Sequence, residues 1–275
     1  MEKLCYFNGE IMALEDVKIS PNDLGILRGY GIFDYLRTYN AKPFLLPQHL
    51  DRLFNSLKLM GLDIKESRDD IATAINRLMG KSSLSDAGFR LVVTGGDSTD
   101  GFQFTSPHLF ILIDELPQYD ERVWSDGVKL MMHEYLRDLP EVKSINYIEA
   151  IRMQPERIRR KAFDILYIHK NNVLECTRSN FFIFQGDVLV TPKENVLIGR
   201  TRNLVVELAK PHFIVEERNI SIDEITSADE AFLTGTTKKV MPVNMLDDIK
   251  VGNAKAGKNT LKLMSLFDEY VKDHY

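Results

Sequence analysis

Hydrophobic and polar positions in the first 115 residues predict short strands around two helices. Asn8-Gly9, a pair that tolerates the positive φ angles of a tight turn, separates two short apolar runs and so predicts a hairpin. An extended segment is expected at 31–39, and strands are expected at 89–94 and 108–113. This pattern indicates one small α/β unit.

The two helices are predicted between these strands. Pro47 begins the first, and Gly61 is placed to end it. Its apolar residues recur at helical spacing. They are Leu50, Leu53, Phe54, Leu57 and Met60. His49 and Arg52 lie off that stripe, and the second helix is expected to end at Gly80.

Strands predominate in the second half of the chain, with helices between them. The expected elements are a strand at 128–135, a helix near 147–163, hairpins turning at Asn171-Asn172 and Gly186-Asp187, a helix at 201–210, a capping box of Ser221 and Glu224, strands at 230–233 and 240–243, and a final amphipathic helix carrying Leu261, Leu263, Met264, Leu266 and Phe267. Many strands with interspersed helices favour an α+β fold over a doubly wound sheet.

A domain boundary is predicted in the segment from Asp114 to Glu121. It contains Leu116-Pro117 and four acidic residues, which is linker chemistry, because proline fixes its own φ and disfavours helix in the preceding residue. The predicted domains are therefore 1–115 and 123–275, with a linker at 116–122.

Composition excludes several classes of protein. Hydrophobic residues make up 44% and charged residues 27%, as in globular proteins. A chain of 275 residues can bury a core large enough to fold without disulfides or a structural metal. The apolar runs are too short for a membrane span, and no secretory signal is evident. A net charge of −5 without a basic block disfavours nucleic acid as a partner. Two cysteines and six scattered histidines indicate the reducing cytoplasm and no metal site.

Two short segments have the composition of anion-binding turns. Residues 198–202 (Ile-Gly-Arg-Thr-Arg) lead into the predicted helix at 201–210, so free amides and the helix dipole would face a phosphate. Residues 234–237 (Thr-Gly-Thr-Thr) follow a predicted strand. Each alone is more typical of a helix cap or a turn than of an anion site. Without a nucleotide-binding motif elsewhere, the two together indicate a small phosphorylated ligand.

Lys143 lies between a predicted strand and a predicted helix. Most lysines are solvated surface charges, and this remains the alternative for Lys143. A restricted site at such a junction would lower the pKa of the amine by desolvation and make it a nucleophile. A Schiff-base lysine together with a phosphate site suggests pyridoxal phosphate.

Six segments, in this order, resemble motifs of the fold type IV pyridoxal-phosphate enzymes: 31–37, 49–52, 143–147, 175–180, 199–202 and 233–237. This family includes branched-chain aminotransferases, D-amino acid aminotransferases and aminodeoxychorismate lyases, and the resemblance covers nearly the whole chain. It implies an α+β fold with a small N-terminal α/β domain and a larger C-terminal pseudo-barrel domain that binds the cofactor. It also implies a homodimer.

The resemblance implies a role for each motif residue. Lys143 would hold pyridoxal 5'-phosphate as an internal aldimine and move the proton of the substrate α-carbon. Glu175 would face the pyridine nitrogen, where its charge favours the protonated ring. Without the resemblance, Glu175 is an ordinary strand-end carboxylate. The implied phosphate partners are Arg52, Arg200, Thr201, Thr236 and Thr237.

The substrate side departs from the family pattern. Cys176 stands where glycine is common, Arg200 where isoleucine is common, and Arg178 adds a cation. Arg37 and Arg90 are candidates for the substrate carboxylate or for structural pairing. Tyr30, Phe33 and Tyr35 are candidates for the pocket wall or for the core.

The expected reaction is amino transfer between a branched-chain-like amino acid and a 2-oxo acid. The segment 95–98 lacks the Arg-x-His pattern associated with D-amino acid recognition, which disfavours a D-amino acid aminotransferase. An aminodeoxychorismate lyase that releases pyruvate is the other alternative. A binding protein without chemistry is disfavoured, because Lys143 and Glu175 are both present.

Overall fold

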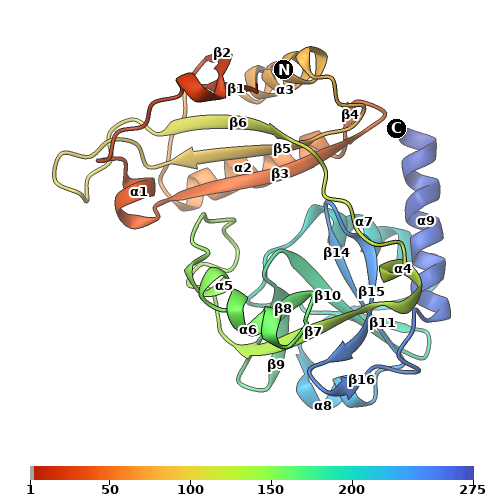
Figure 1. Ribbon diagram of the computed structural model, residues 1–275. Coiled ribbons are helices and arrows are strands. Elements are labelled where there is room, and N and C mark those ends of the chain that lie inside the picture. Colours follow the sequence, from red (N-terminus) through yellow and green to blue (C-terminus); the bar gives the residue numbers. More distant parts are fainter. Residues whose placement is uncertain (1–2) are drawn as a thin grey trace. The chain divides into compact units, whose positions relative to one another are not determined.

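The computed structural model of the chain describes residues 3–275 and divides into two compact units (Figure 1). Unit 1 extends to Pro117 and also includes Val142–Tyr147 and Tyr275. Unit 2 consists of Gln118–Glu141 and Ile148–His274. The sequence places 142–147 in the C-terminal domain, whereas its contacts place it in unit 1.

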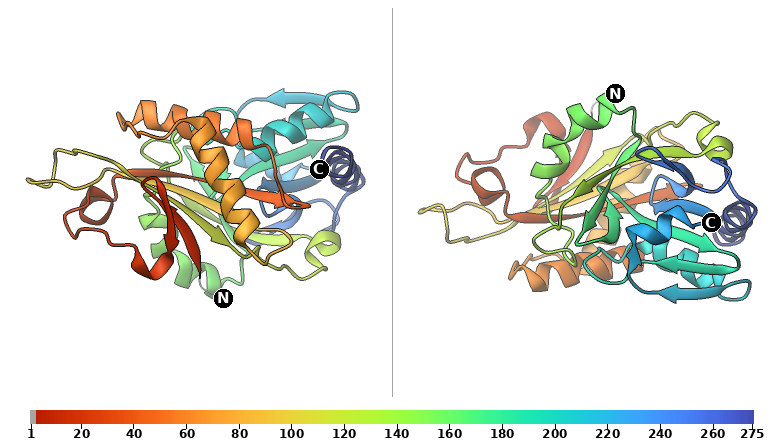
Figure 2. Two further views of the ribbon diagram at one scale, coloured as in Figure 1. Left: turned by 90° about the horizontal axis from the view of Figure 1, so that it is seen from above. Right: turned by 90° about the horizontal axis from the view of Figure 1, so that it is seen from below.

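Unit 1 is a six-stranded antiparallel sheet in the order β2-β1-β6-β5-β3-β4. Figure 2 shows α2 and α3, in orange, on one face of this sheet. The elements are β1 (Leu4–Phe7), β2 (Glu10–Ala13), η1 (Leu14–Asp16), α1 (Leu24–Arg28), β3 (Gly31–Tyr39), β4 (Lys42–Pro43), α2 (Leu46–Leu59), α3 (Arg68–Lys81), β5 (Gly88–Thr94) and β6 (His108–Asp114). The predicted hairpin, strands and helices of this region are confirmed.

Helix α2 forms where its apolar spacing predicts. Pro47 lies in its first turn, and Gly61 follows its end with a φ of +62°, a conformation that glycine adopts without strain. Leu50, Leu53 and Leu57 are buried in the core of unit 1. The apolar stripe of this helix is therefore confirmed as its packing face.

His49 and Arg52 are also buried, with exposed fractions of 1% and 6%, although they lie off the apolar stripe. The reason is a carboxylate on β3. Side chains alternate along a strand, so Ile32, Asp34 and Leu36 share the buried face, and Asp34 is 0% exposed. A charge is buried at tolerable cost only when it is paired and hydrogen-bonded, and Asp34 supplies that partner.

Unit 2 is built around a barrel-like sheet. Strands β10, β14, β15, β7, β8 and β9 pair in that order, and β9 also pairs with β10, which closes the ring. Helix α9 packs against β15 and α7 (Figure 1). The elements are α4 (Val123–Asp126), β7 (Val128–Glu134), α5 (Ile148–Arg152), α6 (Gln154–Arg159), β8 (Asp164–His169), β9 (Asn172–Cys176), β10 (Ser179–Gln185), β11 (Val188–Thr191), α7 (Arg200–Ala209), β12 (Ile214–Glu217), β13 (Ile220–Ser221), α8 (Ile222–Thr226), β14 (Glu230–Gly235), β15 (Lys239–Leu246), β16 (Ile249–Lys250) and α9 (Lys258–His274).

The single helix predicted near 147–163 is wrong, because the chain forms two short helices, α5 and α6, with Met153 between them. Pro155 explains the break: proline has no N–H to donate and clashes with the preceding turn, so it is found in the first turn of α6. The capping box of Ser221 and Glu224 is confirmed at the start of α8.

Among the described residues, no helix combines the length and the hydropathy needed to cross a bilayer. Cys5 and Cys176 are both buried free thiols.

Candidate active site

Lys143 lies on a short segment that pairs with the edge of β3. The Phe33 N–H donates to the Lys143 carbonyl at 2.8 Å, and the Ile145 N–H donates to the Gly31 carbonyl at 3.1 Å. This antiparallel bridging places Lys143 opposite Phe33, and opposite side chains share a face. The Lys143 Nζ is 4.4 Å from the Phe33 ring centroid. The backbone of this half-buried lysine is therefore held in place.

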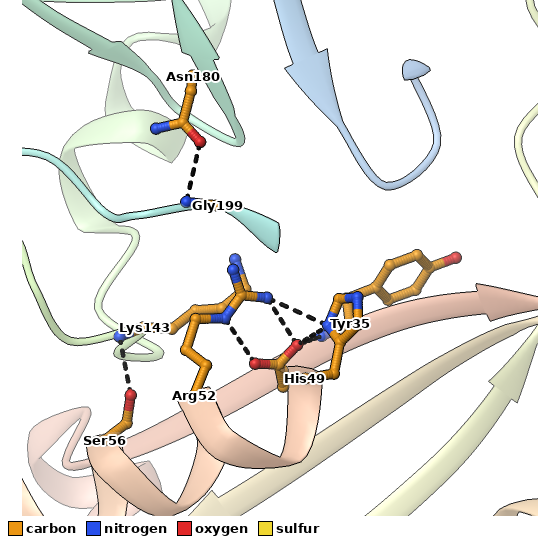
Figure 3. A network of polar contacts seen from close by, with 8 residues as sticks. Tyr35, His49, Arg52, Ser56, Lys143, Asn180 and Gly199 are labelled. Atoms are coloured by element: carbon orange, nitrogen blue, oxygen red, sulfur yellow. Dashed lines mark hydrogen bonds and ion pairs between the residues drawn. The ribbon is translucent and has the colours of Figure 1, made fainter. Parts of the chain in front are cut away.

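A second contact joins the lysine segment to α2. The Lys143 N–H lies 3.5 Å from the Ser56 hydroxyl oxygen, and Ser56 is 0% exposed (Figure 3). Phe33 also meets Tyr147 edge-on, with ring centroids 5.7 Å apart. The segment is thus attached to unit 1 through backbone and side chains.

Arg52 is oriented by two bonds to a buried carboxylate. Its Nε donates to Asp34 Oδ2 at 2.8 Å and its Nη2 donates to Oδ1 at 2.7 Å, while His49 Nδ1 lies 2.7 Å from Oδ1. Figure 3 shows Arg52 and His49 converging from α2. Burial alone would raise the pKa of Asp34, but Arg52 and His49 hold that pKa well below its usual range. Nη1 of Arg52 takes no part in this pairing.

Glu175 lies at the seam where β9 meets β10. Its Oε1 accepts from Arg137 Nε at 2.9 Å and from Arg137 Nη2 at 2.8 Å. Its Oε2 accepts from the Leu197 N–H at 3.1 Å. Arg137 also donates to the Pro140 carbonyl. Charge-assisted bonds of this kind fix both the charge and the direction of the carboxylate.

Asn180 on β10 brings the predicted residues of unit 2 together. It is paired in register with Glu175 on one side and with Thr234 on the other. Its Oδ1 accepts from the Gly199 N–H at 3.2 Å, and its Nδ2 donates to the Leu197 carbonyl at 2.6 Å. One side chain therefore links the Glu175 strand, the 234–237 turn and the start of α7.

Gly199 directly precedes helix α7 and has no side chain to cap the first turn. A Cβ at Gly199 would lie 2.2 Å from Asn180 Oδ1, so this close approach requires glycine. Arg200 takes the first helical position, and Thr201 is buried behind it. An uncapped helix start directs N–H donors and the positive end of the helix dipole at an anion.

Three threonines lie at the end of β14 and in the turn after it: Thr234, Thr236 and Thr237. The Thr234 hydroxyl is buried, and among the residues described it has no hydrogen-bond partner. Thr236 and Thr237 are half-buried, and the Thr237 hydroxyl lies 3.1 Å from that of Tyr119. A buried hydroxyl without a hydrogen-bond partner costs free energy, and binding of a polar ligand would supply that partner.

The aromatic candidates for the substrate side fall in different environments. Phe33 contacts Lys143, as described above. Tyr35 covers Gly88, where a Cβ would lie 1.9 Å from the Tyr35 hydroxyl. Tyr30 donates its hydroxyl proton to the Met60 carbonyl and stacks on Phe104.

Both arginine candidates have partners within unit 1. Arg37 donates from Nε to the Thr38 carbonyl at 3.1 Å and lies 4.0 Å over the Tyr39 ring. Arg90 pairs with Asp114 at 2.9 Å, and its side chain is 48% exposed. Phe33, Tyr35 and Arg37 nevertheless alternate with Asp34 along β3, so they share the face that carries Lys143.

Sequence reasoning missed Asp34, Arg137 and Asn180. Asp34 had a detectable signal, because a carboxylate in register with Ile32 and Leu36 indicates a buried charge in need of a partner. Arg137 gave no such signal, since it lies 38 residues from Glu175 in a segment without regular structure.

Known proteins resemble this chain along most of its length. A family model described as amino-transferase class IV matches residues 31–246. The "Putative branched-chain-amino-acid aminotransferase" of Methanocaldococcus jannaschii is 31% identical over 277 residues, which cover 96% of this chain and 95% of that protein. A D-alanine aminotransferase of Staphylococcus epidermidis is 26% identical, with 98% of each chain covered.

Solved structures share the fold. The Escherichia coli branched-chain amino acid aminotransferase superposes with a TM-score of 0.91 at 24% identity, covering 98% of this chain and 94% of that chain. Another branched-chain amino acid aminotransferase, solved with pyridoxamine 5'-phosphate, superposes with a TM-score of 0.92 at 23% identity, covering 100% and 96%. A "Putative 4-amino-4-deoxychorismate lyase" of Legionella pneumophila superposes with a TM-score of 0.84 at 27% identity, covering 93% and 96%.

The two-unit α+β fold with its barrel-like sheet is that of the fold type IV enzymes, as the sequence predicts. The chain belongs to the class IV aminotransferase family and is an enzyme. Enzymes of this family use pyridoxal phosphate.

Proposed function

We propose that this enzyme transfers an amino group between a branched-chain amino acid and a 2-oxo acid, with pyridoxal phosphate bound through Lys143. The observation that carries the proposal is the pairing of the 143–145 segment with β3, which holds the Lys143 backbone opposite Phe33 with the amine 4.4 Å from the Phe33 ring centroid. The branched-chain preference is supported by the 31% identity to the Methanocaldococcus jannaschii relative, against 26% to the D-alanine aminotransferase.

The residues of unit 2 fit such a cofactor. The Thr234 hydroxyl is buried without a partner among the described residues, and the close approach at Gly199 leaves no room for a Cβ. The unpartnered hydroxyl suits a phosphate ester, for which we assign Arg200, Thr201, Thr236 and Thr237, with Arg52 as a further partner; the Gly199 approach holds the start of α7 against Asn180. Glu175, held by Arg137, is assigned to the ring nitrogen.

These residues perform separate tasks in the proposed reaction. Pyridoxal phosphate, when bound, supplies an electron sink for negative charge at the substrate α-carbon. The Lys143 Nζ would hold the cofactor and would accept and return the proton of the substrate α-carbon, so one amine would serve in both binding and proton transfer. The Glu175 carboxylate holds a proton at the ring nitrogen, since an opposite charge nearby favours the protonated form.

Product analysis tests the reaction and the substrate. The enzyme is incubated with 2-oxoglutarate and, separately, L-leucine, L-valine, L-isoleucine or D-alanine, and glutamate is measured. We expect glutamate from the branched-chain L-amino acids. Glutamate from D-alanine alone would overturn the preference.

An aminodeoxychorismate lyase is the second candidate, supported by the 27% identity to the Legionella pneumophila protein. It predicts pyruvate release from 4-amino-4-deoxychorismate without any 2-oxo acid. Pyruvate release together with no amino transfer would replace the first proposal with this one.

We also propose a homodimer. Helix α1 and the 97–107 segment pack together, with Arg28 5.1 Å from the Phe102 ring, and they expose a group of apolar side chains. The group consists of Ile26, Leu27, Phe102 and Phe104. An exposed apolar patch marks an interaction site, and a two-fold contact is the commonest way to cover one. Light scattering at micromolar concentration checks this, and a monomer with full activity would contradict it.

A further inference from the structure

A buried ion pair in unit 2 lies outside the groups assigned above. Lys238 Nζ is 2.7 Å from Asp164 Oδ2, and the two side chains are 4% and 5% exposed. The same Nζ donates to the Ser179 hydroxyl oxygen at 2.6 Å. Asp164 Oδ1 accepts from the Thr177 hydroxyl at 2.5 Å and from the Ile165 N–H at 2.8 Å. The ammonium group and the carboxylate thus each make more than one hydrogen bond.

This network connects two turns that carry proposed cofactor-binding residues. Lys238 directly follows Thr236 and Thr237, and its N–H donates to the Gly235 carbonyl at 3.1 Å. Thr177 and Ser179 belong to the 177–179 turn, which follows the strand that carries Glu175. The ion pair therefore ties the 234–237 turn both to the start of β8 and to the 177–179 turn.

The two turns are also in direct contact. A Cβ on Gly235 would lie 3.4 Å from the Arg178 carbonyl oxygen and 3.4 Å from the Ser179 hydroxyl oxygen. Because the turns touch, a small change in the length or charge of the Lys238 side chain would shift one turn against the other. The distance between them is thus sensitive to this ion pair.

Stability alone does not account for such a pair. Removing two charges from water is costly, and apolar replacements of buried ion pairs are often neutral or stabilising. Burial alone would raise the pKa of Asp164, but Lys238 and the Thr177 hydroxyl hold that pKa below its usual value. What an ion pair with directed bonds adds over an apolar contact is a defined geometry.

We propose that Lys238 and Asp164 are positioning residues. They set the spacing between the 177–179 turn and the 234–237 turn, and thereby the affinity for the cofactor phosphate. The proposal rests on the proposed function, because it takes these turns to bind pyridoxal phosphate. The ion pair is assigned no contact with the reacting atoms; it would act through the threonines that follow β14.

Pyridoxamine 5'-phosphate is the suitable probe, because it has no aldehyde and binds without a bond to Lys143. Its dissociation constant is measured by calorimetry on the full chain, together with the melting temperature. The test variants are Asp164→Asn/Lys238→Met, which removes both charges, and Ser179→Ala, which removes one acceptor. Lys239→Met is the matched control, because the neighbouring lysine pairs with Asp268 at 2.7 Å where the side chains are 34% and 60% exposed.

We expect the double variant to bind the probe about tenfold more weakly, the lower end of what loss of an orienting partner does to a bound metal. Ser179→Ala should show a smaller loss, and Lys239→Met none. The affinity should stay reduced in Ser179→Ala even where its melting temperature equals that of the wild type, which a purely structural role would not produce.

The experiment distinguishes failure of the proposed function from failure of the positioning role. If the wild-type chain does not bind pyridoxamine phosphate, the proposed function falls and this inference falls with it. If the wild type binds and both test variants bind as tightly as Lys239→Met, the positioning role is overturned while the proposed function stands. Should the double variant not fold, Ser179→Ala decides alone.

Discussion

The two units each hold a predicted site residue against an opposite charge, but the pairs are built in reverse. In unit 1 the predicted residue is the cation Arg52, and its carboxylate partner is Asp34. In unit 2 the predicted residue is the carboxylate Glu175, and its cationic partner is Arg137. The first pair is the more deeply buried, with side chains 7% and 0% exposed, against 8% and 18% for Glu175 and Arg137.

This difference in burial separates the effect of a charged pair on stability from its effect on chemistry. Asp34 lies in the packed core, so loss of its partner leaves a charge with no access to water. Arg137 retains contact with solvent, and the more exposed pair has less to lose in stability. We therefore expect the pair in unit 1 to govern folding as well as binding, and the pair in unit 2 to govern chemistry.

The largest effect is expected from a residue that belongs to neither pair. Lys143→Ala should lower turnover by at least about a thousandfold, because one amine serves as nucleophile and as proton carrier. Steady-state rates with the preferred amino acid measure this. Binding of pyridoxamine phosphate should persist, and Lys239→Ala serves as the control with normal turnover.

Borohydride reduction of the loaded enzyme sharpens the same prediction. The cofactor should be fixed irreversibly to Lys143 and located there by peptide mapping. An adduct on another lysine would contradict the assignment of Lys143.

Arg52→Met should destabilise the folded chain by about 3–5 kcal/mol, the typical cost of removing one partner of a buried ion pair. Arg137→Met, in the more exposed pair, should cost less. Urea denaturation of the two variants side by side checks the ranking. Asp34→Asn/Arg52→Met should recover part of the loss, and equal costs for the two single variants would contradict the comparison.

Glu175→Gln should lower turnover by about a hundredfold, comparable to the loss of one preorganised electrostatic partner. The neutral amide no longer favours a proton on the ring nitrogen, whereas the phosphate partners are untouched. The affinity for pyridoxamine phosphate should therefore stay near that of the wild type. Arg52→Met should show the opposite pattern, with weaker cofactor binding and a smaller effect on turnover of the loaded enzyme.

The smallest effect concerns acid stability. The pKa of Asp34 is depressed in the folded chain, so the folded state binds fewer protons than the unfolded state near and below the usual value of 3.8. The contribution of Asp34 to stability is thus fully present above that pH and is lost as pH falls through the folded pKa. Melting temperatures between pH 5 and pH 2 should fall more steeply for the wild type than for Asp34→Asn.

Local patterns were sufficient to predict most of the elements. The spacing of Leu50, Leu53 and Leu57 determines the buried face of α2, and the residues of the α8 capping box are three positions apart in sequence. The helix predicted near 147–163 is broken in two at a position that Pro155 explains. Elements set by neighbours in the chain are readable from the sequence alone.

The site was predictable only as far as its motifs reach. Lys143 and Glu175 follow from the resemblance, and their functional roles are predictions still to be tested. Their surroundings depend on residues far apart in sequence: Arg52 finds Asp34 across 18 positions, and Glu175 finds Arg137 across 38. No local pattern encodes such a meeting, because it arises only when strands and helices pack.

The pairing of 142–147 with β3 also has a consequence for biosynthesis. The chain leaves unit 1 after Pro117, returns for this segment, and returns once more at its last residue, Tyr275, whose hydroxyl accepts from the Leu45 N–H. Domains generally fold in the order in which the ribosome delivers them. The Tyr275 contact of the N-terminal unit therefore forms only after unit 2 has been synthesised, and a fragment starting at residue 118 would carry Lys143 without the strand that holds it.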